Sequence, residues 1–161
     1  MMRIATSFAL ALALLAAGPS DAQDAAPAIM IGGQVQHPGA ITLADLQKLP
    51  PVTVAIAFAT DKGGESANYK GALLSTIVSN AAPIDGPGKN AGFRHTIVVT
   101  GRDGYAATLS EGEIDPKLEG KMVVLAYEKD GNPVKEGIRL VVPGDHMGAR
   151  AVRDVVKIEV Q

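Results

Sequence analysis

Short apolar runs separated by turn residues extend along the chain from residue 29, and they limit its fold more than any other feature. Runs rich in β-branched residues, bounded by Gly, Pro and Asp-Gly turns, are typical of strands and hairpins. The predicted strands are 29–35, 52–60, two arms within 94–110, one run with its turn within 121–134, and the last two strands within 137–160. Strands outnumber helices, so the predicted class is α+β with a mixed or antiparallel sheet and short helices.

Two helices are predicted between these strands. Thr42 is placed as an N-cap with Asp45 three residues later, and the prolines at 50–51 end the first helix. The second helix is predicted over 69–83, where leucine, isoleucine and valine recur at helical spacing, and the segment before it, 61–68, is predicted to be a loop.

The N-terminal residues have the pattern of a secretory signal peptide. Residues 1–22 contain one basic residue, Arg3, then a short apolar run and a small-residue cleavage site that ends at Ala22. The prediction is a Sec-type signal peptide (1–22), a flexible segment (23–28) and one domain (29–161), exported to the periplasm with no membrane span after cleavage.

Composition excludes several classes of function. The net charge is −2 and aromatic residues make up 4% of the chain, which argues against nucleic-acid binding. The chain has no cysteine, so it forms no disulfide and offers no thiol nucleophile. The three histidines lack the short spacing of a metal site, so no metal ligand is predicted. Four carboxylates are predicted to be solvated: Asp61, Glu65, Glu111 and Glu113.

The segment "GIRLVVPGDHMGARAVRDVVKIEV" (137–160) combines turn glycines with three arginines. Glycines let a ligand approach the backbone closely, and arginines with turn N–H groups bind phosphate. The predicted ligand-binding residues are Arg139, Gly144, His146, Gly148, Arg150 and Arg153, with Arg139 and His146 the weaker candidates. The alternative is an ordinary turn between two strands, with solvated arginines.

The order of four motifs resembles the molybdopterin-binding domain of the sulfite oxidase type. They are "GGQVQHPGAITLADLQKLP" (32–50), "YKGALLSTIV" (69–78), "RDGYAATLS" (102–110) and the segment 137–160. The resemblance implies that family's fold, an oxidoreductase background, and a cleft for molybdopterin or a related phosphate-bearing ligand. It also implies that Arg150 and Arg153 face the cofactor.

The sequence departs from the catalytic members at the residue that binds the metal. Those members supply a Cys thiolate after the first long strand, and the matching region "VTVAIAFATDKGG" (52–64) has none. The possible oxygen ligands are Thr60, Asp61 and Ser66, which are otherwise ordinary loop residues. The N-terminus also lacks the arginine pair of the export route used by proteins preloaded with this cofactor. Bound molybdenum is therefore not expected.

Three functions stay open from the sequence, and with them the question whether the protein is an enzyme. In the first, the protein is a cofactor-free relative that binds a small anionic or pterin-like ligand, or a partner, in the family cleft. Alternatively, it is a genuine molybdopterin-dependent oxidoreductase with a metal ligand other than cysteine. Third, it is an interaction module with a vestigial cleft, working beside a periplasmic redox or signalling partner.

Overall fold

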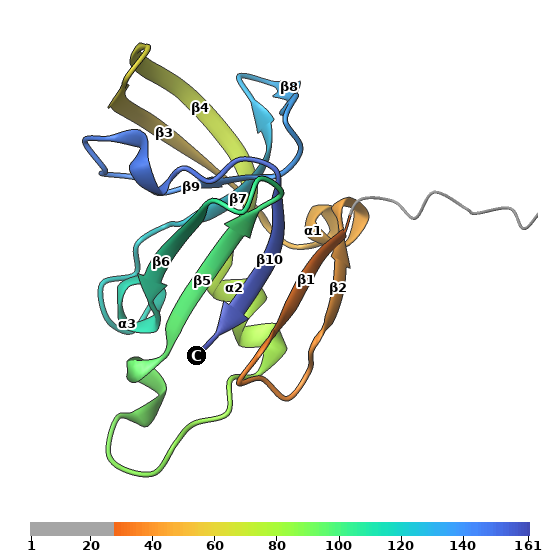
Figure 1. Ribbon diagram of the computed structural model, residues 1–161, viewed down its shortest axis with the longest axis vertical. Coiled ribbons are helices and arrows are strands. Elements are labelled where there is room, and N and C mark those ends of the chain that lie inside the picture. Colours follow the sequence, from red (N-terminus) through yellow and green to blue (C-terminus); the bar gives the residue numbers. More distant parts are fainter. Residues whose placement is uncertain (1–27) are drawn as a thin grey trace, which may run out of the picture.

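The computed structural model describes residues 28–161, which form two packed β-sheets connected by short helical segments (Figure 1). The predicted signal peptide and its cleavage site lie outside the described residues. The first sheet has the order β2 (Gly39–Thr42), β1 (Ala28–Gly33), β10 (Val155–Val160), β5 (Thr96–Gly101) and β6 (Ala106–Ser110). Strands β1 and β10 pair in parallel, and the other neighbours in this sheet pair antiparallel, which gives the mixed sheet that the sequence predicts.

The second sheet is antiparallel and contains the longest strands of the described chain. Its order is β3 (Pro51–Thr60), β4 (Gly63–Leu73), β7 (Val124–Lys129) and β8 (Asn132–Pro133), and β9 (Arg139–Val141) also pairs with β7. Strands β3 and β4 pair over ten residues without a bulge, and this hairpin projects beyond the rest of the domain (Figure 1).

Short helical segments connect the strands. They are α1 (Leu43–Lys48), α2 (Leu74–Ala81), η1 (Ala91–Arg94), α3 (Glu111–Ile114) and η2 (Gly148–Arg150). The predicted cap of α1 is confirmed: the Thr42 hydroxyl accepts from the Asp45 N–H at 3.2 Å, and the Asp45 carboxylate accepts from the Thr42 N–H at 3.1 Å. No helix within residues 28–161 has the length and apolar character needed to span a membrane.

Two predictions around β4 are wrong. The predicted loop 61–68 is reduced to a two-residue turn, and the predicted helix 69–83 begins only at Leu74. Alternating burial does exist in β4, but the inward residues there include Ala67 and Gly71, whose small side chains give no apolar signal. Gly71 is needed because a Cβ at this position would overlap the backbone of Leu125 in β7. The strand β2 was also missed, because it immediately precedes the cap of α1.

Two clusters of buried side chains form the core. The larger one lies between the sheets and includes α2 residues such as Leu74 and Ile77. The smaller one covers the opposite face of the second sheet, with Ile56, Phe58 and Tyr69 among its members. The smaller cluster extends along β3 and β4 to the end of the hairpin, where the candidate site lies.

A candidate ligand-binding cleft

A cleft of about 400 Å³ opens where the end of β3, the β5–β6 turn and the η2 segment meet. Segments far apart in the sequence therefore contribute to it: two of the four sequence motifs, 102–110 and 137–160, meet there with the end of the 52–64 region. The residues on which its chemistry depends are Phe58, Asp61, Tyr105, Arg139, Gly148 and Arg153.

Gly148 fixes how closely the C-terminal loop approaches β3. A Cβ at Gly148 would lie 2.8 Å from Cε2 of Phe58, so the space is available only to glycine. The contact is reinforced by a backbone hydrogen bond in which the Ala59 N–H donates to the His146 carbonyl at 2.9 Å. The close approach at Gly148 is made to an aromatic ring that borders the cleft, and the approach of a ligand to this glycine stays a prediction.

Arg139 lies at the bottom of the cleft, almost completely buried, and it is largely neutralised. Its two terminal nitrogens donate to the Glu65 carboxylate at 3.2 and 3.1 Å, and one of them also donates to the Tyr69 hydroxyl at 2.7 Å. Its Nε is buried and has no hydrogen-bond partner among the described residues. Arg139 is therefore chiefly a structural cation, with one donor left unsatisfied beside the cleft.

Glu65 is the centre of this buried ion cluster. Burial alone would raise the pKa of its carboxyl group, but hydrogen bonds from Lys129 and Tyr69 and the charge of Arg139 lower that pKa to about 2. The prediction that Glu65 is a solvated carboxylate is wrong, because β4 carries it into contact with β7 and β9.

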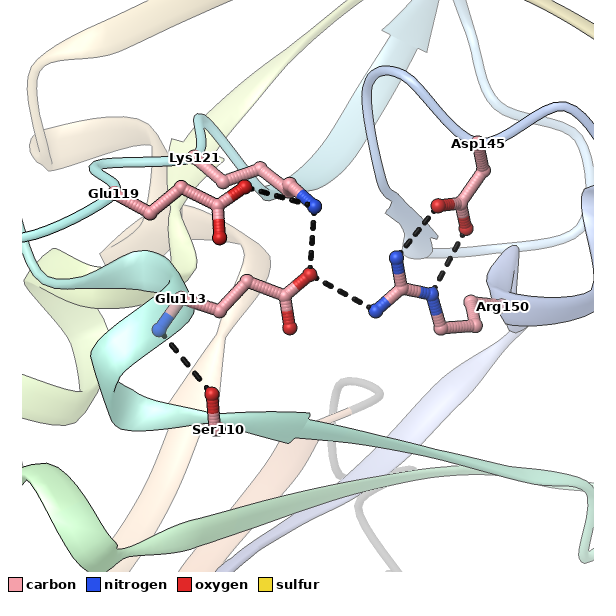
Figure 2. A network of polar contacts seen from close by, with 6 residues as sticks. All are labelled: Ser110, Glu113, Glu119, Lys121, Asp145 and Arg150. Atoms are coloured by element: carbon pink, nitrogen blue, oxygen red, sulfur yellow. Dashed lines mark hydrogen bonds and ion pairs between the residues drawn. The ribbon is translucent and has the colours of Figure 1, made fainter.

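Arg150 is held by carboxylates and does not line the cleft. In Figure 2 the Arg150 guanidinium donates two hydrogen bonds to the Asp145 carboxylate, at 2.9 and 2.5 Å, and one to the Glu113 carboxylate at 3.0 Å. Lys121 bonds to the same Glu113 oxygen at 2.8 Å. These partners raise the pKa of Arg150 above its usual range. The network ties the C-terminal loop to α3, and it makes Glu113 a second carboxylate that was wrongly predicted to be solvated.

Arg153 is the cationic side chain that remains free at the cleft. It lines the cavity, is exposed, and has no side-chain hydrogen bond or ion pair within residues 28–161. Beside it, the Tyr105 hydroxyl donates to the Ala149 carbonyl and so joins the β5–β6 turn to η2. The rim also carries Asp103 and Asp61, so the cleft presents one free cation and two carboxylates.

The other two predicted site residues lie outside the cleft. Gly144 has φ +87° in an exposed turn, which explains the glycine without a ligand. His146 is exposed and borders a shallow hollow on another part of β3, together with Glu65 and Ser66. Of the six predicted residues, the structure brings Arg139, Gly148 and Arg153 together around one cavity.

The residues around the end of β3 do not reproduce a thiolate metal site. Thr60 is the last residue of β3, and its hydroxyl closes the β3–β4 turn by donating to the Gly63 carbonyl at 2.7 Å and accepting from the Lys62 N–H at 3.2 Å. Ser66 lies outside the cleft, whereas Thr60 and Asp61 line it, and Asp61 is the one carboxylate among these three possible oxygen ligands. No group of three or more His, Asp or Glu in the described part of the chain is arranged to hold a metal ion. The described residues of the cleft thus offer the guanidinium of Arg153 to a ligand, but no thiolate to a metal.

Fold and cleft together define a domain of the sulfite oxidase type. The chain belongs to the oxidoreductase molybdopterin binding domain family, whose model matches residues 17–161. Among solved structures, it is similar to the sulfane dehydrogenase SoxCD from Paracoccus pantotrophus, with a TM-score of 0.68 and 20% sequence identity. The match covers 83% of this chain but only 37% of the SoxCD chain, and at this identity it shows the fold alone. The comparison with curated proteins finds no match.

Sequence reasoning missed the residues that neutralise the arginines. Glu65, Glu113 and Asp145 are separated from their arginine partners by 74, 37 and 5 residues. No local pattern reports the first two pairs, because they depend on how the strands are arranged. The spacing of Asp145 and Arg150 was visible within one motif, but it does not by itself indicate a bidentate pair.

Proposed function

We propose that the protein binds a small phosphate-bearing ligand of the molybdopterin type in this cleft, in the periplasm, without molybdenum redox chemistry of its own. Family membership supports the ligand class, and the lack of cysteine in the whole chain removes the thiolate that fixes the metal in catalytic members. When bound in those members, the cofactor supplies the redox centre. In this chain the residues are equipped to hold and orient the ligand.

The observation that carries the proposal is the free guanidinium of Arg153 beside Gly148. The other two arginines of the motif already have carboxylate partners, whereas Arg153 has none among the described residues. A charge-assisted hydrogen bond to phosphate contributes roughly 1.5–3 kcal/mol. The tight contact of Gly148 with Phe58 holds the loop that precedes Arg153 against β3.

The two carboxylates at the rim of the cleft narrow the class of ligand that we expect to bind there. A bare phosphate would be repelled by Asp61 and Asp103, whereas a pterin carries ring N–H and amino groups that can donate to carboxylates. A ligand with a phosphate at one end and N–H donors at the other matches both signs of charge. We therefore expect a pterin phosphate to bind more tightly than inorganic phosphate.

A second candidate function rests on Asp61. This carboxylate lines the cleft, is exposed and forms no ion pair with another described residue, so it is the oxygen ligand that a molybdenum oxidoreductase without cysteine would use. Under this alternative, Asp61→Asn abolishes metal retention. Under the main proposal, the same change leaves folding intact and alters only ligand affinity.

The test is a ligand-induced shift in melting temperature, measured with inorganic phosphate and with a pterin phosphate ester. We expect the ester to stabilise the wild type and Arg150→Ala, and to lose most of its effect on Arg153→Ala. Arg94→Ala is the matched control, since Arg94 is an exposed arginine outside the cleft. Equal stabilisation of wild type and Arg153→Ala would overturn the proposal and favour an interaction module that uses a periplasmic partner.

A further inference from the structure

Strand β3 forms an edge of the second sheet, and between its two ends it has none of the usual protection against pairing. It is ten residues long, whereas β2, β6 and β8 at the other ends of the two described sheets have four, five and two. Edge strands are normally blocked by charges, internal prolines or bulges. Between Pro51 and Thr60 there is no charged residue, no internal proline and no bulge.

The free hydrogen-bonding groups of this edge can be assigned to particular residues. The Ala59 N–H donates to His146, on the side of β3 away from β4. Because N–H and C=O directions alternate along a strand, the groups of Thr53, Ala55 and Ala57 point to the same outer side. Their backbone groups have no outer partner among residues 28–161, and all three residues are exposed.

This free run is bounded at both ends by residues that cannot extend it. At one end Ala59 already has His146 as its partner, and at the other end Pro51 has no N–H. The midpoint between these two residues is Ala55. A two-fold axis at Ala55 would therefore set Thr53 opposite Ala57 of a second copy, and Ala59 opposite Pro51. Every N–H and C=O of Thr53, Ala55 and Ala57 then finds a partner, and neither Pro51 nor the Ala59 N–H is required to donate.

We propose that two copies of this chain associate through β3, antiparallel and centred on Ala55, to form one continuous sheet. The facing pairs are Thr53 with Ala57, Ala55 with Ala55, and Ala57 with Thr53. Each pair exchanges two backbone hydrogen bonds, which gives about six in total. The facing side chains are alanine and threonine, small and uncharged, so nothing in them opposes close approach. An edge whose free groups match themselves across a two-fold axis favours a second copy over an unrelated extended peptide.

The pairing has a consequence for the cleft, although the inference itself does not depend on the proposed function. Ala59 lines the cleft and lies opposite Pro51 of the second copy in this register. The segment that joins α1 to β3 in the second copy would then border the opening. Each copy would complete one wall of the other's cleft.

The experiment combines sedimentation velocity over a concentration series with charge substitutions at the axis. We expect the wild type to form dimers, and Ala55→Lys and Ala55→Glu each to be monomeric, because like charges face each other across the axis. An equimolar mixture of these two variants should form dimers again. Thr108→Lys is the matched control, since Thr108 is an exposed residue of β6 at the edge of the other sheet. A wild type that stays monomeric throughout, or dimers that Thr108→Lys disrupts and Ala55→Lys does not, would overturn the proposal.

The absence of native cysteine allows the register to be tested separately. Facing residues in a hydrogen-bonded pair have Cα atoms about 5.5 Å apart, within the range of a disulfide. Ala55→Cys should form a disulfide-linked dimer under mild oxidation. Ala57→Cys should not link to itself but should link to Thr53→Cys. Self-linking of Ala57→Cys as fast as that of Ala55→Cys would contradict the register.

Discussion

Glu65 and Arg139 are 74 residues apart in the sequence and form a bidentate ion pair, with N–O distances of 3.2 and 3.1 Å, and of the two it is Arg139 that lines the cleft. The pair joins β4 to β9. The Glu65 carboxylate neutralises most of the positive charge that the family motif places at Arg139. Arg139 also lies against the rings of Phe58 and Tyr69, with its guanidinium carbon 5.9 and 5.3 Å from their centres. An arginine that the sequence predicted to bind a ligand thus acts mainly as part of the core.

The change Glu65→Gln tests this role. The pKa of Glu65 in the folded protein is about 2, below its ordinary 4.5, so its contribution to stability is fully present above pH 4.5 and is lost as the pH falls toward 2. We expect Glu65→Gln to lower the free energy of unfolding by about 3 kcal/mol at pH 7. The difference from wild type should shrink between pH 4.5 and 2.

Urea unfolding at several pH values measures the effect of Glu65→Gln. Glu136→Gln is the control, because Glu136 is exposed and has no ion-pair partner in the described residues. A loss that is the same at pH 2.5 as at pH 7 would show that the carboxylate charge is not what stabilises the cluster.

The change Gly148→Ala should both destabilise the fold and weaken ligand binding. The added methyl group meets the Phe58 ring at 2.8 Å, so the loop or the ring must move, at a cost of roughly 1–3 kcal/mol. Gly39→Ala is the control, since a Cβ there has open space and the backbone needs no positive φ. Thermal unfolding of the two variants compares them directly, and equal stability would mean that the loop is not tightly packed on β3.

Arg150→Ala separates stability from binding. This change leaves the half-buried Asp145 without its partner and removes one of the two cations on Glu113, so we expect a loss of roughly 1–3 kcal/mol in unfolding free energy. Because Arg150 does not line the cleft, the affinity for a pterin phosphate, measured by calorimetry, should change less than twofold. A large loss of affinity with unchanged stability would place Arg150 in the site, as the sequence motif suggested.

Thr42→Ala tests the best-determined local structure. The hydroxyl of Thr42 caps α1 and exchanges hydrogen bonds with Asp45, so its removal should cost about 1 kcal/mol of stability without affecting the cleft. Thr42→Ser, which keeps the hydroxyl, should recover most of the loss. If Ser and Ala are equally destabilising, packing of the methyl group is responsible instead.

Local patterns predicted the elements whose causes are local. The Thr42 cap, the hairpin of β5 and β6 and the Asp130-Gly131 turn all depend on residues a few positions apart. Strand β4 was missed because its inward residues are small, and their burial depends on contact with β3 and β7. The predictions for the site divide in the same way, into features with local causes and features that depend on the fold. Glycine and arginine at the motif positions were visible, but which arginine stays free depends on carboxylates that other strands supply.

The metal and pterin content of protein purified from its native compartment tests the central claim most directly. We expect molybdenum far below one atom per chain, together with a releasable phosphate-bearing compound whose retention is lost in Arg153→Ala. One molybdenum per chain with bound pterin, retained in Arg153→Ala and lost in Asp61→Asn, would contradict it and establish a molybdenum enzyme with an oxygen ligand.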